Sequence, residues 1–219
     1  MPVQIDPSVR LNLPSAKFAG CIYEGVRVAA SSEVLRSEIR GEQERVLSGL
    51  TLASLYGDPG IVESRQAFRA LGLDPSRYRP SQEALLRRIL QGKEMYCINS
   101  GVDVCNLLSL RFRMPMGLYD QDKIAGVPIL RIGTPADVYA ALNGRDVSCE
   151  DKLILCDEEG ALGGPYVDSV RSTVTEATRN FLHVVYFCYE GLTDTAFTQM
   201  QETFLRYHAG GTKGYKFLE

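Results

Sequence analysis

The sequence has no tryptophan and only two histidines among its 219 residues, His183 and His208. Neither has a second histidine four positions away or a cysteine pair beside it, which are the spacings that zinc sites use. Six cysteines are scattered singly without a C-x-x-C pair, so we expect buried free thiols. These absences lead us to expect no metal, no other cofactor and no catalysis by imidazole.

Long apolar runs are also missing. No stretch approaches the roughly 18 apolar residues of a membrane span. The first residues, MPVQIDP, lack a basic start followed by an apolar segment, as a secretory leader would have. We therefore expect no membrane association and a cytoplasmic location.

Charge of one sign is not in large excess, because the net charge is -3. A protein that binds nucleic acid strongly over its whole surface is therefore excluded, since phosphate binding depends on clustered Lys and Arg. Residues 61–93 are locally basic, with seven basic side chains against three acidic ones. Arg79, Arg87 and Arg88 in this segment are candidates for nucleic-acid contact, and a solvated helix face is the alternative.

The order of expected elements mixes helices with separated strands. Strands are expected at 17–30, 96–98, 127–132, 152–156 and 181–189, from their β-branched and aromatic content. Helices are expected at 32–54, 61–71, 82–90, 100–112, 135–142 and 192–207, from apolar spacing and from caps such as Ser32 and Ser81. Residues 209–214, AGGTKG, are expected to be a flexible tail.

This order predicts an α/β (α+β) fold, a mixed sheet with helices packed on it, in one domain over 1–219. Within that domain we distinguish a helical N-terminal part (31–72), a core (79–187) and a C-terminal helix (193–208) followed by the tail.

Two sequence blocks and a later turn carry a family resemblance. Residues 97–106 read CINSGVDVCN, and residues 114–124 read MPMGLYDQDKI. They resemble the patterns I-N-x-x-V-D-V-x-N and x-P-x-H-x-[FY]-D-x-D-[KR]-[IL] of the B3/B4 tRNA-editing domain of the phenylalanyl-tRNA synthetase beta subunit. GALGG at 160–164 is similar to that family's small-residue turn. The resemblance covers about half of the chain and implies a freestanding domain of this kind.

The resemblance implies hydrolysis of the ester that joins a wrong amino acid to the 3′ end of tRNA, so Arg79, Arg87 and Arg88 become candidate tRNA contacts. Activated esters can be hydrolysed by orienting water and donating hydrogen bonds to the carbonyl oxygen, without a covalent nucleophile. We assign the catalytic role to Asp168 and to exposed backbone amides near Gly163 and Gly164. The candidate substrate-binding residues are Asn99, Cys105, Asn106, Gly117, Ser169 and Thr173.

The sequence departs from the family pattern at two positions. Gly117 stands where the pattern has histidine, and Pro165 stands where an acidic residue commonly follows the Gly-Gly turn. Chemistry by those two side chains is excluded. Ser169 is not expected to form an acyl-enzyme, because it has no G-x-S-x-G elbow and no histidine partner.

Three functions remain open at this point. The first is a trans-acting aminoacyl-tRNA deacylase, and the second is a non-catalytic module that binds tRNA or an amino acid. The third is a different small-molecule hydrolase on the same scaffold, since a fold alone does not fix function. For Asp168 the alternative to catalysis is a loop carboxylate that caps a turn.

Overall fold

The computed structural model describes residues 3–189 and 192–218. The helices are α1 (Pro7–Asn12), α2 (Glu33–Gly49), α3 (Pro59–Ala70), α4 (Ser81–Leu90), α5 (Ser100–Phe112) and α6 (Asp194–Tyr207), with 3-10 turns η1 (Ser54–Gly57) and η2 (Gln121–Lys123). The strands are β1 (Gln4–Ile5), β2 (Ala19–Glu24), β3 (Met116–Asp120), β4 (Ile129–Ile132), β5 (Val138–Ala140), β6 (Asp146–Ser148), β7 (Leu153–Asp157), β8 (Gly160–Gly163), β9 (Asn180–Val185), β10 (Gly211–Thr212) and β11 (Lys216–Phe217).

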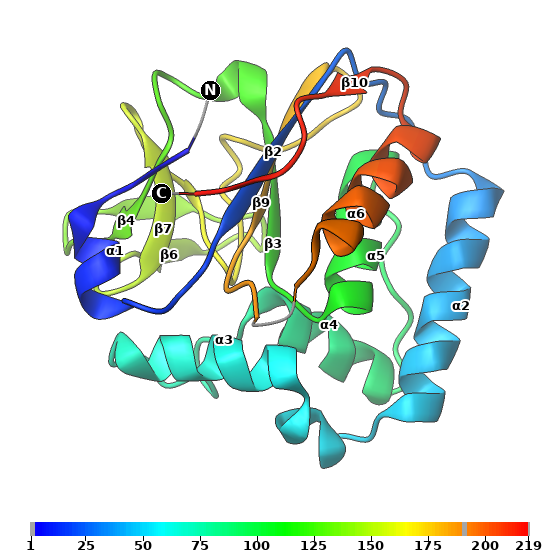
Figure 1. The fold of residues 1–219 in the computed structure, drawn as a ribbon, viewed down its shortest axis with the longest axis horizontal. Helices are drawn as coiled ribbons and strands as arrows, with labels where there is room; N and C mark the ends of the chain where they lie inside the picture. The colour runs from blue at the N-terminus through cyan, green and yellow to red at the C-terminus, as the bar shows by residue number, and fades with distance from the viewer. Residues whose placement is uncertain (1–2, 190–191, 219) are drawn as a thin grey trace.

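Two larger sheets, a two-stranded β5-β6 sheet and helices make up the described part of the molecule (Figure 1). The sheet in the order β10-β2-β9-β3 is antiparallel, and β11 also pairs with β2. The sheet in the order β1-β4-β7-β8 is mixed, because β1 runs parallel to β4. The expected α/β architecture, a mixed sheet with helices packed on it, is confirmed.

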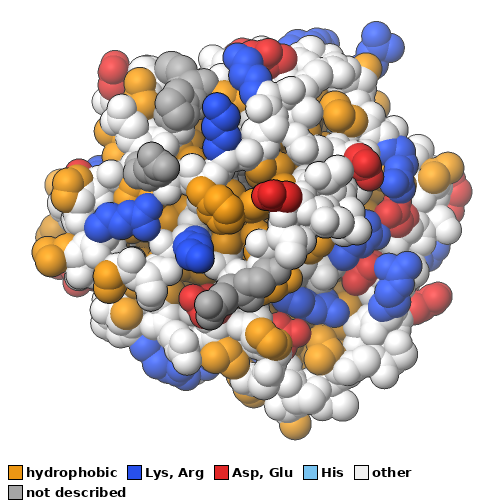
Figure 2. All heavy atoms as spheres, in the orientation of Figure 1, with side chains coloured by type: hydrophobic (Ala, Val, Ile, Leu, Met, Phe, Trp, Pro, Cys, Tyr) orange, Lys and Arg blue, Asp and Glu red, His pale blue; other side chains and the backbone are white. Residues whose placement is uncertain are grey.

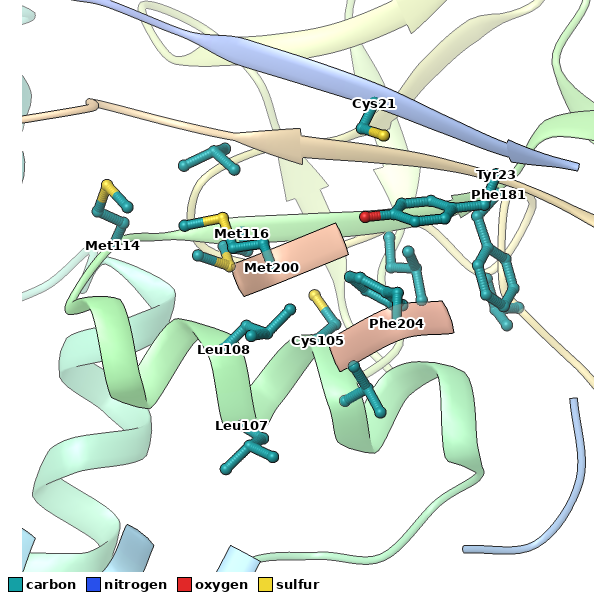
Figure 3. Packing of buried hydrophobic residues seen from close by; sticks show 14 of the residues in the cluster. Cys21, Tyr23, Cys105, Leu107, Leu108, Met114, Met116, Phe181, Met200 and Phe204 are labelled. Carbon is teal, nitrogen blue, oxygen red and sulfur yellow. The ribbon is translucent and has the colours of Figure 1, made fainter. Parts of the chain in front are cut away.

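The strand β9 separates two cores because successive side chains of a strand point to opposite faces. Phe181 and Val185 face α5 and α6, where they pack with Cys105, Leu108 and Phe204 (Figure 3). Leu182, Val184 and Tyr186 face the β1-β4-β7-β8 sheet and pack with its leucines. The first part of the apolar run at 181–189 thus forms a central strand, as expected, and the strand ends at Val185.

Two sequence expectations of secondary structure were wrong. Residues 96–98 are not a strand; they precede α5 without ladder pairing. Residues 135–142 are not a helix, because Asp137 accepts hydrogen bonds from Thr134 and pairs with Arg131 at 2.6 Å, which holds a turn before the β5-β6 hairpin. The segment expected to be a flexible tail contains β10, which pairs with β2, and the Tyr215 ring just after it stacks on Phe197 at 5.0 Å.

The surface mixes charges of both signs over the helical side of the molecule (Figure 2). Of the six thiols, five are buried as expected and Cys97 is exposed. Within the described part of the chain, no helix combines the length and the apolar character needed to cross a membrane.

Candidate functional site

Asp168 lies against the end of β8, where it forms an isolated bridge with Gly163. Gly163 has φ +150°, and a Cβ there would lie 2.9 Å from the Asp168 Cα and 2.5 Å from its Oδ1. Only glycine leaves room for this approach. The structure therefore brings together two residues that we assigned to catalysis and gives Gly163 a steric role.

The Asp168 carboxyl is shielded from water although the residue as a whole is half-buried. Its Oδ1 has no hydrogen-bond partner among the described residues. Burial raises the pKa of Asp168 to about 7, against the smaller opposite influence of the Tyr119 hydroxyl and the Leu118 backbone N–H. A carboxyl with this pKa exchanges a proton near neutral pH, as a general base requires.

Two tyrosines that the sequence did not single out complete this site. Tyr119 on β3 and Tyr186, just after β9, are fully buried, and their hydroxyl oxygens lie 2.6 Å apart. Burial raises the pKa of both, and the Asp168 charge adds to that shift. Both hydroxyls are therefore protonated; one of them donates to the other, and the proton of the second is available to a further acceptor.

The absence of a side chain on Gly117 makes room for the ring of Tyr119. The two residues share one face of β3, and a Cβ on Gly117 would lie 2.7 Å from Cζ of the Tyr119 ring. The tyrosine ring thus fills the space over Gly117. A glycine two positions before a tyrosine in one strand is the sequence signal for such a folded-back ring.

The candidate residues Asn99, Cys105 and Asn106 lie at different points along α5 and have different surroundings. Asn99 caps the helix, with its Oδ1 accepting from the Val102 N–H at 3.0 Å and its Nδ2 donating to the Val174 carbonyl at 3.1 Å. Cys105 is buried, and burial together with the Asp168 charge raises the pKa of its thiol. Asn106 is half-buried one position further along the helix. Cys105 therefore belongs to the surroundings of Asp168, whereas the polar atoms of Asn99 are used within the fold.

Residues 164–173 form the segment that carries Asp168, and we call it the Asp168 segment. Ser169 accepts a hydrogen bond from the Arg171 N–H at 3.2 Å, and Thr173 donates to the Val170 carbonyl at 2.7 Å. Gly163 and Gly164 are buried, so the exposed amides expected there are not present. A Cβ on Gly164 would lie 2.7 Å from the Leu153 carbonyl oxygen, which gives this glycine a packing role.

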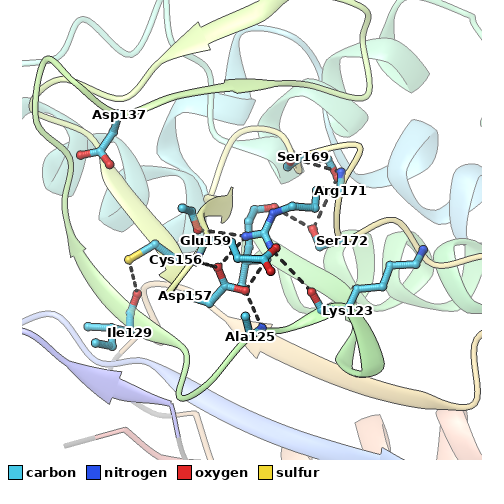
Figure 4. A network of polar contacts seen from close by, with 12 residues as sticks. Lys123, Ala125, Ile129, Asp137, Cys156, Asp157, Glu159, Ser169, Arg171 and Ser172 are labelled. Atoms are coloured by element: carbon cyan, nitrogen blue, oxygen red, sulfur yellow. Dashed lines mark hydrogen bonds and ion pairs between the residues drawn. The ribbon is translucent and has the colours of Figure 1, made fainter.

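Arg171 fastens the Asp168 segment to the β7-β8 hairpin (Figure 4). Its guanidinium lies 2.6 Å from Asp157 Oδ1 and 3.3 Å from Glu159 Oε2. Burial raises the pKa of Asp157, but the Arg171 guanidinium and the N–H groups of Ala125 and Glu159 lower it by more, so it lies below its ordinary value. Charge pairing therefore holds the Asp168 segment against the β7-β8 hairpin.

The three arginines predicted to contact tRNA lie on or before α4. Arg79 is exposed, donates to the Ser76 carbonyl at 3.0 Å and lies 3.8 Å from Glu83. Arg87 and Arg88 lie in the last turn of α4 and contact Tyr56 and Tyr96. The N-terminus of α4 adjoins the Asp168 segment, because the Ser81 N–H donates to the Pro165 carbonyl at 2.8 Å.

A hollow of about 920 Å³ lies elsewhere, between β2 and the C-terminal strands. Its lining includes Val3, Ile22, Leu182, Lys216 and Leu218, and no residue of the Asp168 segment. The Asp168 site and the hollow beside β2 therefore lie in different parts of the structure. The Asp168 site is the stronger candidate, because an unpaired buried carboxyl oxygen requires a specific explanation and a mainly apolar hollow does not.

The geometry defines an α/β domain with a buried carboxyl beside β8, at the edge of the mixed sheet. The B3/4 domain family model matches residues 63–204, more than half of the chain, and the chain belongs to this family.

Individual relatives are distant. The uncharacterized protein YhzB of Bacillus subtilis is 20% identical over 188 residues, which cover 85% of this chain and 84% of that protein. Phenylalanine–tRNA ligase beta subunits from Neisseria gonorrhoeae and Psychrobacter arcticus are 29% and 31% identical over 44% and 37% of this chain. The matches span only 13% and 10% of those subunits.

A solved N-terminal fragment of the phenylalanyl-tRNA synthetase beta subunit from Pyrococcus horikoshii has a TM-score of 0.49 and 17% identity. The match covers 96% of this chain and 50% of that chain. We rest nothing on a superposition this loose.

Proposed function

We propose that this chain is a trans-acting, cytoplasmic editing hydrolase that deacylates mischarged aminoacyl-tRNA. The observation that carries the proposal is the Asp168 carboxyl, which is buried, has an Oδ1 without a partner and has a pKa of about 7. Membership in the B3/4 domain family and the likeness to phenylalanine–tRNA ligase beta subunits support the choice of substrate.

In the proposed reaction Asp168 takes a proton from a water molecule as the water oxygen attacks the ester carbonyl carbon. The hydroxyl pair of Tyr119 and Tyr186 lies beside this carboxyl and donates one hydrogen bond, which stabilises the negative charge that develops on the carbonyl oxygen. The bond between the carbonyl carbon and the ribose oxygen then breaks, and the proton on Asp168 passes to that oxygen. The products are a free amino acid and uncharged tRNA, and no covalent intermediate forms.

The substrate reaches Asp168 only when the Asp168 segment opens. The Arg171 pairs with Asp157 and Glu159 are the contacts to be released, and the Arg171 side chain is 28% exposed, so an approaching phosphate competes for it. Opening would bring water to the Asp168 carboxyl, lower its pKa and make it a carboxylate at neutral pH.

The test is hydrolysis of a panel of mischarged tRNAs by the wild-type protein, the Asp168→Asn variant and the Glu176→Gln variant, whose residue is exposed. We expect turnover of at least one pair, a loss of about 100-fold or more in Asp168→Asn, and no change in Glu176→Gln. Absence of hydrolysis above background for every pair would refute the proposal.

A second candidate is a non-catalytic module that binds tRNA or an amino acid. The Tyr119 ring favours it, because this ring fills the space over Gly117 and takes up room beside Asp168 that a reacting ester would need. Binding of tRNA, seen as a thermal shift or by anisotropy, together with absent turnover would identify this function.

A further inference from the structure

An exposed surface at the C-terminal end of α4 combines two tyrosines with two consecutive arginines. Tyr56 and Tyr96 are 46% and 60% exposed. Arg87 Nη1 donates to the Tyr56 hydroxyl at 2.6 Å, and Arg88 Nη1 donates to the Tyr96 hydroxyl at 2.8 Å. We call these four residues the Arg-Tyr surface.

Each tyrosine ring is held in place by a guanidinium. Arg88 lies over the Tyr96 ring at 3.8 Å from its centroid, and Arg65 lies over the Tyr56 ring at 4.9 Å. Arg88 also donates to the Glu94 carbonyl at 2.6 Å, which fixes the segment that carries Tyr96. Two large rings are thus ordered at the surface instead of being buried, although burial is where their apolar area would stabilise the fold most.

The charge of this region is positive at the surface. Glu83, an acidic residue of α4, is fully buried and is paired with Arg65 at 2.9 Å, so its charge does not oppose Arg87 and Arg88, which are half-buried. Lys93 adds a further cation, and Glu94 is the exposed acid of this segment. Exposed rings interleaved with cations are the combination that binds single-stranded nucleic acid, because bases stack on the rings and phosphates pair with the cations.

We propose that the Arg-Tyr surface binds a single-stranded RNA segment, with bases stacked on the free faces of Tyr56 and Tyr96. This inference rests on the proposed function, for which it names the part of the RNA that the protein holds. A ten-residue helix rises about 15 Å, so α4 links this surface to the Pro165 end of the Asp168 segment over a distance that a few nucleotides can span.

The test is fluorescence anisotropy with a labelled single-stranded RNA of about 12 nucleotides and with its duplex. We expect the single strand to bind more tightly than the duplex. Tyr56→Ala and Tyr96→Ala should each weaken binding about tenfold, and Tyr96→Phe should bind within about twofold of wild type. Arg87→Ala with Arg88→Ala should weaken binding and reduce its salt dependence, whereas Arg145→Ala, in an exposed turn of the β5-β6 hairpin, should leave it unchanged.

Unchanged affinity in both tyrosine-to-alanine variants, or equal affinity for the duplex, overturns the proposal. Absence of RNA binding at low salt overturns it as well and reassigns the exposed rings to a protein partner. The probe is not acylated, so this result is independent of turnover: RNA binding without hydrolysis would retain the surface and reject the deacylase.

Discussion

The hydroxyl oxygens of Tyr119 and Tyr186 lie 2.6 Å apart in the interior, on the face of the antiparallel sheet that packs against the other sheet. The two residues come from β3 and from the chain just beyond β9, and the Asp168 charge raises the pKa of both hydroxyls. This pair places hydrogen-bond donors beside a carboxyl in a region that is otherwise lined by leucine and valine. Such a polar group in an apolar core is retained for a reason other than packing.

Tyr119→Phe removes one hydroxyl of this pair and tests its role. The Tyr186 hydroxyl loses this partner, so we expect a loss of about 1 to 2 kcal/mol in the free energy of unfolding. The pKa of Asp168 should rise above about 7, because the Tyr119 hydroxyl lowers it in the wild type. Carbon-13 NMR of the aspartate carboxyls measures the pKa. Tyr23→Phe is the control, since its hydroxyl contacts Tyr215 at 3.3 Å on the opposite face of the sheet and should leave the Asp168 pKa unchanged.

Gly117→Ala tests the close approach of the Tyr119 ring. The added Cβ would meet the ring Cζ at 2.7 Å, which forces a shift of a side chain packed between two sheets. We expect a loss of about 2 kcal/mol in the free energy of unfolding, measured by denaturant titration. Gly41→Ala is a matched control, because its Cβ in α2 meets nothing within 4 Å and should stabilise the helix by up to about 1 kcal/mol. A neutral Gly117→Ala would mean that the ring is free to move aside.

Arg171→Ala should destabilise the protein by about 2 to 3 kcal/mol, because it leaves the buried Asp157 carboxylate without its cation. The ion pair lowers the pKa of Asp157 below its ordinary value of 3.8. Its contribution is therefore present above about pH 4 and is lost as the pH falls through the lowered pKa. The difference in the free energy of unfolding between wild type and variant should become smaller in acid. Denaturant titration at several pH values measures this difference.

The exposed pair of Arg40 and Glu33 supplies the comparison for Arg171. Both side chains are more than half exposed, so Arg40→Ala should cost less than about 1 kcal/mol. Equal effects of the two substitutions would contradict the idea that Arg171 fastens the Asp168 segment.

The sequence predicted the parts of this fold whose patterns are local. The β-branched and aromatic residues before Tyr189 indicated β9, and the apolar spacing with caps indicated α2 through α6. Residues 135–142 were misjudged because an Asp137 turn held by Arg131 and Thr134 decided their structure, and no local pattern shows that contact. The C-terminal strands form only because β2 offers an edge to pair with.

The site was partly predictable for the same reason. Gly163 and Asp168 are five positions apart, and the glycine-rich turn drew attention to both. Tyr119 was overlooked because its hydrogen-bond partner Tyr186 is 67 positions away in the sequence. The room for the Tyr119 ring also depends on the missing side chain of Gly117, which only the folded strand brings beneath the ring. The roles assigned to Asn106, Ser169 and Thr173 in binding substrate stay predictions.

Asp168→Asn connects the chemistry of the site with the stability of the fold. Burial raises the pKa of Asp168 from an ordinary 3.8 to about 7, so the folded protein holds a proton that the unfolded chain has released between these two pH values. Stability therefore falls as the pH rises from about 4 to 7 and is constant above that range with respect to this group. Asparagine has no such proton and should abolish this decline, giving a variant more stable than wild type by about 2 to 4 kcal/mol at pH 8. Thermal unfolding from pH 4 to 8 measures the two curves.

If Asp168 is also the general base, the same substitution removes hydrolysis. One residue change then raises stability and lowers turnover, as expected of a group kept for function at the expense of the fold. Parallel stability curves for the two proteins would show that the carboxyl is hydrated in solution and ionised throughout this range.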